Sequence, residues 1–242
     1  MQPNHPQPQN ESSSAAVGKT SSPQPPTPSP SPPTPTPADI PLYIRQLDYI
    51  WEGPSDHKRR DDPDELIISA YANLQLRLWR SLTKTEVSCV GLAHPNDPLY
   101  ITSFILVPQV STATTTAFCE EEYDNISSCL TSKQIPPCRY AGYWTHTHPS
   151  GMGPNPSSVD EDTYSKPFIQ RPPYGMMLIL GGNNEWFCRL RLRTEKSPSP
   201  LAMSITLPVR VEETTFPLSG IPIAFFTELL HSAIKAPPPP LS

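Results

Sequence analysis

The chain has 242 residues, 35 of them proline, and a formal net charge of −5 at pH 7. This negative balance argues against nucleic acid as a partner, because a nucleic-acid-binding domain usually presents a basic face. No segment has the run of about 18 apolar residues that a membrane helix needs, and the polar first residues lack the basic and apolar regions of a signal peptide, so we expect a soluble cytoplasmic protein with no membrane partner.

The five cysteines lie at scattered positions: Cys89, Cys119, Cys129, Cys138 and Cys188. An odd number without a Cys-x-x-Cys pair argues against a disulfide framework and against a structural zinc knuckle. We expect reduced cysteines in or near the core.

Proline divides the chain into three parts. Residues 1–37 hold twelve of the prolines, no aromatic residue and only two charged ones, so they lack the apolar surface that offsets chain entropy. We predict a disordered Pro-rich arm over residues 1–38, partly in polyproline II, and a Pro-rich tail over residues 236–242. The arm's P-x-x-P arrangements could bind a partner, although a passive tether is the simpler interpretation. Residues 39–235 remain for one folded domain.

The folded part begins with an apolar segment and a helix. Residues 39–53 are rich in Ile, Leu, Tyr and Trp and fit a strand or a packed arm. Asp62-Pro63-Asp64-Glu65 has the form of a helix start, with a capping Asp, a Pro at the first helical position and a Glu three residues after the cap. We therefore predict a helix from Asp62 to about Arg80. Its apolar face consists of Ile67, Ala70, Tyr71, Leu74 and Leu78.

Short β-branched and apolar runs follow and predict a meander of strands. The predicted strands are Glu86–Leu92, Leu99–Val107, Gln109–Phe118 and Tyr140–His148. A helix over Glu120–Ser132, ended by Pro136-Pro137, interrupts the series.

The last third of the chain again mixes helices and strands. A capping box over Ser158–Glu161 predicts a helix that begins at Ser158 and that Pro167 ends. The other predicted elements are strands over Tyr174–Leu180 and Glu185–Arg193 around the turn Gly181-Gly182-Asn183-Asn184, a strand over residues 202–211 and a helix over Ile221–Ile234. Helices set among sequential strands favour an α+β fold, with a mixed, mostly antiparallel sheet flanked by helices.

Residues 144–162 concentrate groups that can bind a metal. His146 and His148 are two residues apart, and since successive side chains of a strand point to opposite faces, both imidazoles should face the same side. A Gly/Pro-rich loop follows, and then a helix start that can return Asp160 to the histidines. Two imidazoles and one carboxylate suit a divalent metal such as zinc, with the fourth position left for water.

Activation of a water molecule at such a metal needs a proton acceptor. Glu161 and Asp162 lie too close to Asp160 along the helix to face the same small site. We prefer Glu86, because it places an acid at the mouth of an otherwise apolar strand, where a charged group needs a partner.

These residues resemble the motif of the JAMM zinc metalloproteases (MPN-type, or JAB-domain), which include deubiquitinases and bacterial enzymes. The family pattern is a Glu on an early strand, then a distant His-(Ser/Thr)-His-Pro, a short loop and Ser-x-x-Asp. This chain has Glu86, then His146-Thr147-His148-Pro149, then Ser157-Ser158-Val159-Asp160. The resemblance runs from about Leu66 to Leu192 and is closest to bacterial members.

The resemblance implies a role for each residue. His146, His148 and Asp160 hold the cofactor, Zn²⁺. Glu86 takes a proton from the zinc-bound water and passes it to the leaving amine, and Ser157 hydrogen-bonds the developing oxyanion.

The loop departs from the family pattern in length. Eight residues, Pro149–Pro156, stand between the second histidine and the serine, where the family usually has seven. We expect the extra residue to bulge outwards from this Gly/Pro loop. Ser158 remains the alternative to Ser157, and Asp162 the alternative to Asp160.

The resemblance further implies a single MPN/JAMM-type domain over residues 39–235 that hydrolyses an amide or isopeptide bond. The expected substrate is the C-terminal tail of a ubiquitin-like protein or its conjugate. The alternative is a catalytically inactive MPN-like scaffold that binds protein partners, against which the complete set of one glutamate and three ligands argues. A nucleic-acid deaminase is disfavoured because its His/Cys/Cys signature is absent from the sequence.

Three arginines alternate along one of the predicted strands: Arg189, Arg191 and Arg193. They fit an ordinary solvent face, with a surface for an acidic substrate tail as the alternative.

Overall fold

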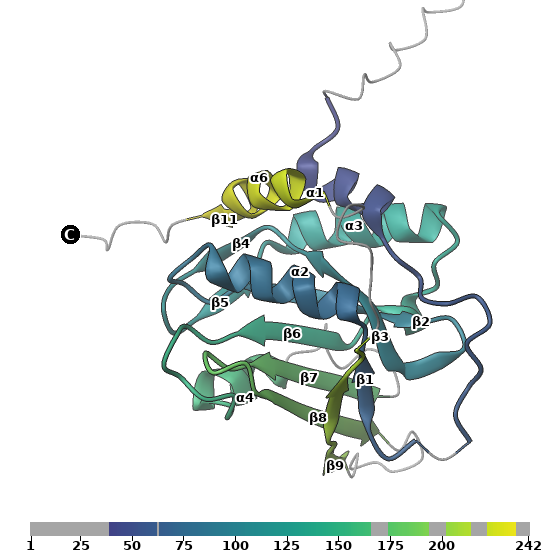
Figure 1. Cartoon of the computed structure of the whole chain (residues 1–242). Coiled ribbons are helices and arrows are strands. Elements are labelled where there is room, and N and C mark those ends of the chain that lie inside the picture. The colour runs from purple at the N-terminus through teal and green to yellow at the C-terminus, as the bar shows by residue number, and fades with distance from the viewer. Residues whose placement is uncertain (1–38, 62, 166–173, 194–201, 214–221, 236–242) are drawn as a thin grey trace, which may run out of the picture. The chain divides into compact units, whose positions relative to one another are not determined.

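A computed structural model describes residues 39–61, 63–165, 174–193, 202–213 and 222–235 (Figure 1). The predicted Pro-rich arm, the Pro-rich tail and Pro167 lie outside these residues. The described residues belong to one unit of the chain, and no helix among them is long and apolar enough to cross a membrane.

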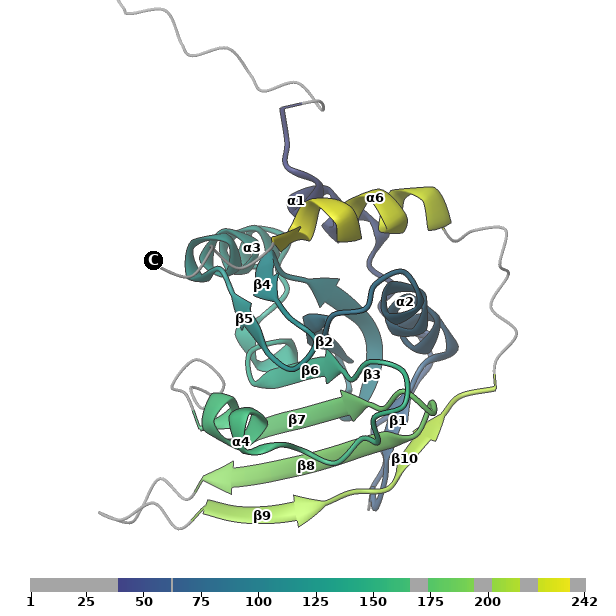
Figure 2. The ribbon, with the colours of Figure 1, turned by 90° about the vertical axis from the view of Figure 1, so that its left-hand side faces the viewer.

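Eight strands form one mixed sheet in the order β10-β1-β3-β2-β6-β7-β8-β9 (Figure 2). They are β1 (Leu66–Ile68), β2 (Ser88–His94), β3 (Asp97–Leu106), β6 (Tyr143–Thr147), β7 (Tyr174–Leu180), β8 (Trp186–Arg193), β9 (Ala202–Thr206) and β10 (Val209–Val211). β1 pairs in parallel with β3 and β10, as does β6 with β7, whereas the other four neighbouring pairs are antiparallel. The predicted mixed, mostly antiparallel sheet is therefore confirmed.

The sheet curls until its two ends come together. β9 and β10 lie at opposite ends of the strand order, yet only Leu207 and Pro208 separate them in the chain. Leu207 donates its N–H to the carbonyl of Cys188 on β8 at 3.1 Å, and the carbonyl of Pro208 accepts the N–H of Leu66 on β1 at 2.9 Å. Because proline has no N–H, Pro208 divides the single strand predicted over residues 202–211 into two.

Helices cover both faces of the sheet, as expected for the α+β class (Figures 1 and 2). They are α1 (Leu42–Arg45), the 3-10 turn η1 (Gln46–Tyr49), α2 (Ala70–Ser81), α3 (Glu120–Ser132), the 3-10 turn η2 (Pro137–Arg139), α4 (Ser158–Tyr164) and α6 (Ile223–Ala233). α2 and α6 share one core, in which Trp79 and Phe226 meet edge to face. α3 packs Ile126 and Leu130 into a second core, and Tyr164 of α4 joins a third, smaller cluster with side chains of β6 and β7.

The predicted strand Gln109–Phe118 is wrong in its middle, where the chain turns back on itself. The hairpin belongs to a second, three-stranded sheet in the order β11-β4-β5. Its strands are β4 (Gln109–Ser111), β5 (Thr116–Phe118) and β11 (Ile234–Lys235). Thr112 favours the turn because its hydroxyl accepts the N–H groups of Thr114 and Thr115, and such local bonds compete with strand pairing.

The helix predicted from Asp62 to Arg80 begins only at Ala70. Asp62 lies outside the described residues, and Leu66–Ile68 form β1 instead of a helical turn. All three of these side chains are buried, in a strand paired on both sides. Burial of three β-forming apolar residues between two strands thus outweighs the local capping signal.

Residues 39–53 form a packed arm and not a strand, which were the two alternatives for this segment. The arm consists of the helical turns α1 and η1. Gln46 fixes it to β3, because its side-chain amide accepts the N–H of Leu106 at 2.8 Å and donates to the Leu106 carbonyl at 2.6 Å. The other predicted strands and helices are present, with ends shifted by no more than three residues.

All five cysteines are free thiols, as predicted. Cys89 and Cys188 are buried and Cys119 and Cys129 are half-buried, whereas Cys138 is exposed and therefore does not belong to the core.

Ser69→Ala is expected to lower the free energy of unfolding by about 1 to 3 kcal/mol. The fully buried Ser69 hydroxyl caps α2 by accepting the N–H of Ala72 at 3.0 Å, and it donates to the carbonyl of Thr102 at 2.8 Å. Urea denaturation measures the loss. Ser81→Ala, at the exposed end of the same helix, is the matched control and should change stability by less than about 0.5 kcal/mol. Equal losses for the two variants would contradict this helix start.

Candidate metal centre

Strand β6 places the first histidine. It lies between β2 and β7, and all five of its residues are buried. The imidazole of His146 stacks on the indole of Trp144, with the ring centroids 4.6 Å apart. Trp144 in turn donates its indole N–H to the hydroxyl of Ser88 on β2 at 2.8 Å. Packing against a fixed aromatic ring therefore holds the His146 side chain.

His148 follows β6 directly and begins the loop to α4. Its backbone N–H donates to the carbonyl of Leu180 at 2.9 Å, and its Nδ1 donates to the carbonyl of Gly153 at 2.6 Å. Because a carbonyl oxygen only accepts, Nδ1 carries the proton and Nε2 is left facing the site. The Nε2 atoms of His146 and His148 are 3.2 Å apart, so the two-residue spacing does bring both imidazoles to one side.

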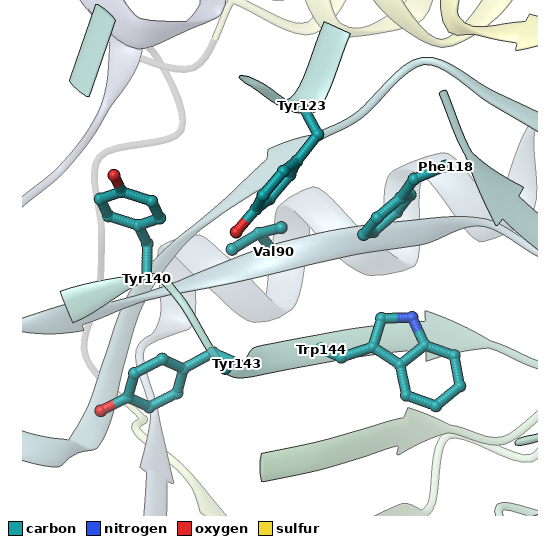
Figure 3. A pocket seen from close by; sticks show the side chains of 7 residues that line it. Val90, Phe118, Tyr123, Tyr140, Tyr143 and Trp144 are labelled. Atoms are coloured by element: carbon teal, nitrogen blue, oxygen red, sulfur yellow. The ribbon is translucent and has the colours of Figure 1, made fainter. Parts of the chain in front are cut away.

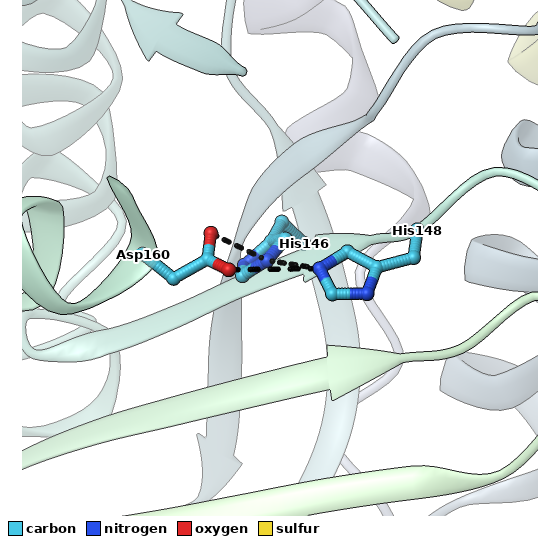
Figure 4. A group of neighbouring side chains, drawn as sticks. All are labelled: His146, His148 and Asp160. Atoms are coloured by element: carbon cyan, nitrogen blue, oxygen red, sulfur yellow. Dashed lines mark hydrogen bonds and ion pairs between the residues drawn. The ribbon is translucent and has the colours of Figure 1, made fainter. Parts of the chain in front are cut away.

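The first turn of α4 brings Asp160 to the histidines (Figure 4). Ser157 and Asp160 form a capping box: the Ser157 hydroxyl accepts the Asp160 N–H at 3.2 Å, and the Ser157 N–H donates to the Asp160 carboxylate at 2.6 Å. Asp160 is buried, with its Oδ1 3.0 Å from Nε2 of His146 and its Oδ2 3.6 Å from Nε2 of His148. The helix cap therefore also aims the carboxylate.

This donor set fits a divalent metal ion. The ligand atoms of His146, His148 and Asp160 all lie within 4.8 Å of one another. With zinc–ligand bonds of about 2.0 to 2.1 Å, tetrahedral ligand atoms stand about 3.3 Å apart, and the Nε2 atoms of the two histidines are 3.2 Å apart. The Asp160 carboxylate approaches them through different oxygens, with Oδ1 3.0 Å from Nε2 of His146 and Oδ2 3.6 Å from Nε2 of His148. Nδ1 of His146 is buried without a hydrogen-bond partner among the described residues, so Nε2 is the atom of this ring that meets polar groups. The buried group can therefore hold a metal ion.

The three side chains have opposing pKa shifts. Burial lowers the pKa of His146 below its usual value, although its hydrogen bond to Asp160 opposes this. Burial also acts to lower the pKa of His148, but the hydrogen bonds to Asp160 and to the Gly153 carbonyl and the charge of Glu86 outweigh it, so this pKa is raised. Burial acts to raise the pKa of Asp160, but hydrogen bonds from both histidines hold it well below its usual range. The carboxylate is therefore ionised at neutral pH.

Glu86 lies just before β2, the strand next to the histidines. β2 and β6 pair with Ser88 opposite His146, and a hydrogen bond from the Thr147 N–H to the Val87 carbonyl at 2.9 Å extends the contact toward Glu86 and His148. The charges of Glu86 and His148 are close enough to shift each other's pKa. The Glu86 side chain is 3% exposed. Burial raises the pKa of its carboxyl to about 7, and the charge of Asp160 adds to the rise while His148 opposes it. A carboxyl with this pKa can accept and release a proton near neutral pH.

An apolar hollow adjoins the site along β6 (Figure 3). It is lined by Val90, Phe118, Tyr123, Tyr140, Gly142, Tyr143 and Trp144, and its empty volume is about 180 Å³ including the open mouth. Trp144 lines the hollow and also stacks on His146. The hollow and the candidate metal centre therefore share one side chain.

The structure separates the alternatives that the sequence left open. Asp162 is exposed on α4 and does not belong to the group of possible ligands. Ser157 and Ser158 are both exposed, and Ser157 is the one that forms the capping box with Asp160. Glu161 forms an ion pair with Arg189. Asp160 is thus the carboxylate that joins the two histidines, and Ser157 is the serine hydrogen-bonded to it.

The predicted arginine stripe is only partly a solvent face. Arg189 is paired with Glu161 and also lies over the ring of Phe187. Arg191 lies over the ring of Tyr164, 4.5 Å from its centroid. The side chain of Arg193 is outside the described part of the structure.

Sequence reasoning missed two groups that support the site. The first is Trp144, whose two-residue spacing from His146 on the strand was a usable signal. The second is the Gly153 carbonyl, which the sequence hides because any residue has a carbonyl and only the loop conformation aims it at His148.

No family model matches this chain, and no curated protein matches it either. The candidate centre is therefore argued from its geometry and from the motif in the sequence.

Asp160→Asn is expected to weaken zinc binding at least about 100-fold, since substitutions outside the ligand sphere alone cost 10- to 100-fold. Asparagine retains a side-chain acceptor for the cap of α4, so helix stability is largely preserved. Competition against a chromogenic chelator measures the affinity. Asp162→Asn, two residues along the helix and exposed, is the matched control and should bind like the unmodified chain. Equal affinities for the two variants would mean that the cluster is only a hydrogen-bonded network.

The metal-free chain should become less stable between about pH 4.5 and 7 through Glu86. The pKa of Glu86 rises to about 7 on folding, so the folded state binds the proton more tightly, and this stabilisation is present at low pH and lost as the pH rises. Relative to the unmodified chain, Glu86→Gln should therefore gain about 3 kcal/mol between pH 4 and pH 8.

Urea denaturation in the presence of a chelator measures this difference. Glu185→Gln, at an exposed position of the β7–β8 turn, is the control and should follow the unmodified chain at every pH. Parallel stability curves for Glu86→Gln and the unmodified chain would show that Glu86 titrates normally.

Proposed function

We propose that residues 39–235 form an MPN-like domain that acts as a JAMM-type zinc-dependent hydrolase of amide or isopeptide bonds. The observation that carries the proposal is the buried convergence of His146, His148 and Asp160, with the buried Glu86 carboxyl near enough to interact with the charges of His148 and Asp160. The same four residues carry the resemblance of the sequence to the JAMM motif.

Zinc is the metal we propose, because two imidazoles and one carboxylate match its preferred ligands. A site with three protein ligands keeps a position for water or substrate, which is the pattern of catalytic rather than structural zinc. When bound there, the metal would polarise a water molecule and the scissile carbonyl.

Glu86 is the proposed proton carrier. Its buried carboxyl interacts with the charges of His148 and Asp160, so it is the group that would accept a proton from the attacking water and return that proton to the leaving amine. Enclosure of this carboxyl by buried groups also keeps bulk water from competing for the proton.

Ser157 is the proposed oxyanion donor. Its hydroxyl oxygen accepts the N–H of Asp160, which leaves the hydroxyl hydrogen for a substrate oxygen. The residue is exposed at the N-terminus of α4, where a substrate can approach and where the helix dipole favours a developing negative charge.

We propose the C-terminal tail of a ubiquitin-like protein, or its conjugate, as the substrate, with a cytoplasmic site of action. The support is the resemblance to JAMM deubiquitinases and to the bacterial members of that family. The alternative function is that of an inactive scaffold, which would bind such partners without hydrolysing them. The following experiment distinguishes the two functions.

Glu86→Gln is expected to abolish hydrolysis, with kcat lowered about 10²- to 10⁴-fold, while zinc is retained at about one equivalent, because glutamine cannot accept the proton and does not ligate the metal. The assay measures release of amine from ubiquitin-like isopeptide conjugates and from short amide reporters, together with metal content.

Glu185→Gln, an exposed position, is the matched control and should turn over substrate normally. Full activity of Glu86→Gln would remove Glu86 from the mechanism. A zinc-loaded but inert unmodified chain that still binds the conjugates would favour the scaffold instead.

A further inference from the structure

We infer that Gly181 and Gly182, in the turn between β7 and β8, are positioning residues for the metal ligand His148. They form a seat for the loop Pro149–Pro156, and the loop conformation on this seat aims the Gly153 carbonyl at His148. The inference deepens the proposed function, because it concerns the same metal centre.

The seat works by close approach of two backbones. A Cβ atom added at Gly182 would stand 2.4 Å from the Pro149 carbonyl oxygen and 2.7 Å from the Gly151 nitrogen. One added at Gly181 would stand 2.8 Å from the Pro154 nitrogen. All three atoms belong to the loop backbone, so any larger residue must displace the loop rather than a flexible side chain.

Hydrogen bonds attach the loop to the seat. The N–H of Gly182 donates to the carbonyl of Met152 at 2.7 Å, and the N–H of His148 donates to the carbonyl of Leu180 at 2.9 Å. Met152 directly precedes Gly153, whose carbonyl accepts from Nδ1 of His148 at 2.6 Å. A displaced loop therefore moves the acceptor that selects which nitrogen of His148 faces the metal.

Arg80, near the C-terminal end of helix α2, holds the seat in place through hydrogen bonds to the turn. The guanidinium of Arg80 donates to the carbonyl of Gly181 and to Oδ1 of Asn184, the latter at 2.6 Å. Within the turn, Gly181 accepts the N–H of Asn184 at 3.0 Å. The turn is thereby connected to a helix that contributes no ligand to the metal centre.

The test is the zinc affinity of the full chain, measured by chelator competition. Gly182→Ala should bind zinc about 10- to 100-fold more weakly, as is typical when a group outside the ligand sphere is lost. In the zinc-loaded protein the Nδ1 proton of His148, visible by NMR through its hydrogen bond to Gly153, should also exchange faster with water. A variant that is merely less stable, with the loop still on its seat, would keep both the zinc affinity and the slow exchange of the Nδ1 proton.

Two further variants serve as an independent test of the seat and as a control. Arg80→Met loosens the turn without adding an atom to it, so it should weaken zinc binding in the same direction even if Gly182→Ala folds poorly. Glu185→Gln changes an exposed side chain of the same turn and should leave both the affinity and the Nδ1 proton signal unchanged.

The outcomes separate this inference from the proposed function. Zinc affinity and Nδ1 proton exchange that match the unmodified chain in both Gly182→Ala and Arg80→Met would overturn the seat and leave the hydrolase intact. Weakened zinc binding in a chain that hydrolyses no substrate would support the seat and overturn only the hydrolase. An unmodified chain that binds no zinc would overturn both.

Discussion

The antiparallel pairing of β2 with β6 is the constraint on which the candidate centre depends. It sets Ser88 opposite His146, fixes Trp144 through the Ser88 hydroxyl and brings Glu86, two residues before Ser88, near His148. Because strand side chains alternate between faces, a slip of one residue would turn Glu86 away from the histidines. Neighbours on both sides hold this register, since β3 pairs with β2 and β7 pairs with β6.

Much of the fold could be predicted because its signals are local. The hairpin of β7 and β8 follows from two apolar runs around Gly181-Gly182, and α3 begins with three glutamates, which suit the positive end of a helix dipole. The error at residues 62–68 has the opposite cause. A capping pattern there favours a helix, but Leu66–Ile68 pair with β3 and β10, and neither partner is adjacent in the sequence. The long strands predicted over 109–118 and 202–211 failed for local reasons, at Thr112 and Pro208.

In the candidate site too, features set by local sequence can be predicted, whereas features set by contacts between distant segments cannot. The two-residue spacing of His146 and His148 is a local pattern that can be deduced from the sequence alone. The helix start is local too, but the capping box predicted over Ser158–Glu161 is wrong by one residue, because the observed box joins Ser157 to Asp160. Glu86 can be singled out from the sequence as an acid at the mouth of an apolar strand, but its approach to His148 depends on the pairing of two segments about sixty residues apart, which no local pattern reveals. The seat at Gly182 cannot be predicted from the sequence. A glycine is also expected in the turn between β7 and β8, so its presence does not reveal that the backbone of the loop lies close to it.

Asp160 serves two structures at once, and this has a consequence for local unfolding. Its carboxylate accepts the Ser157 N–H that caps α4 and also meets both histidines. Fraying of the first turn of α4 therefore removes a charge from the cluster, and a cation held by that charge opposes the fraying by mass action. The backbone amides of this short helix become a natural reporter of occupancy, because their hydrogen exchange slows whenever the cluster is filled.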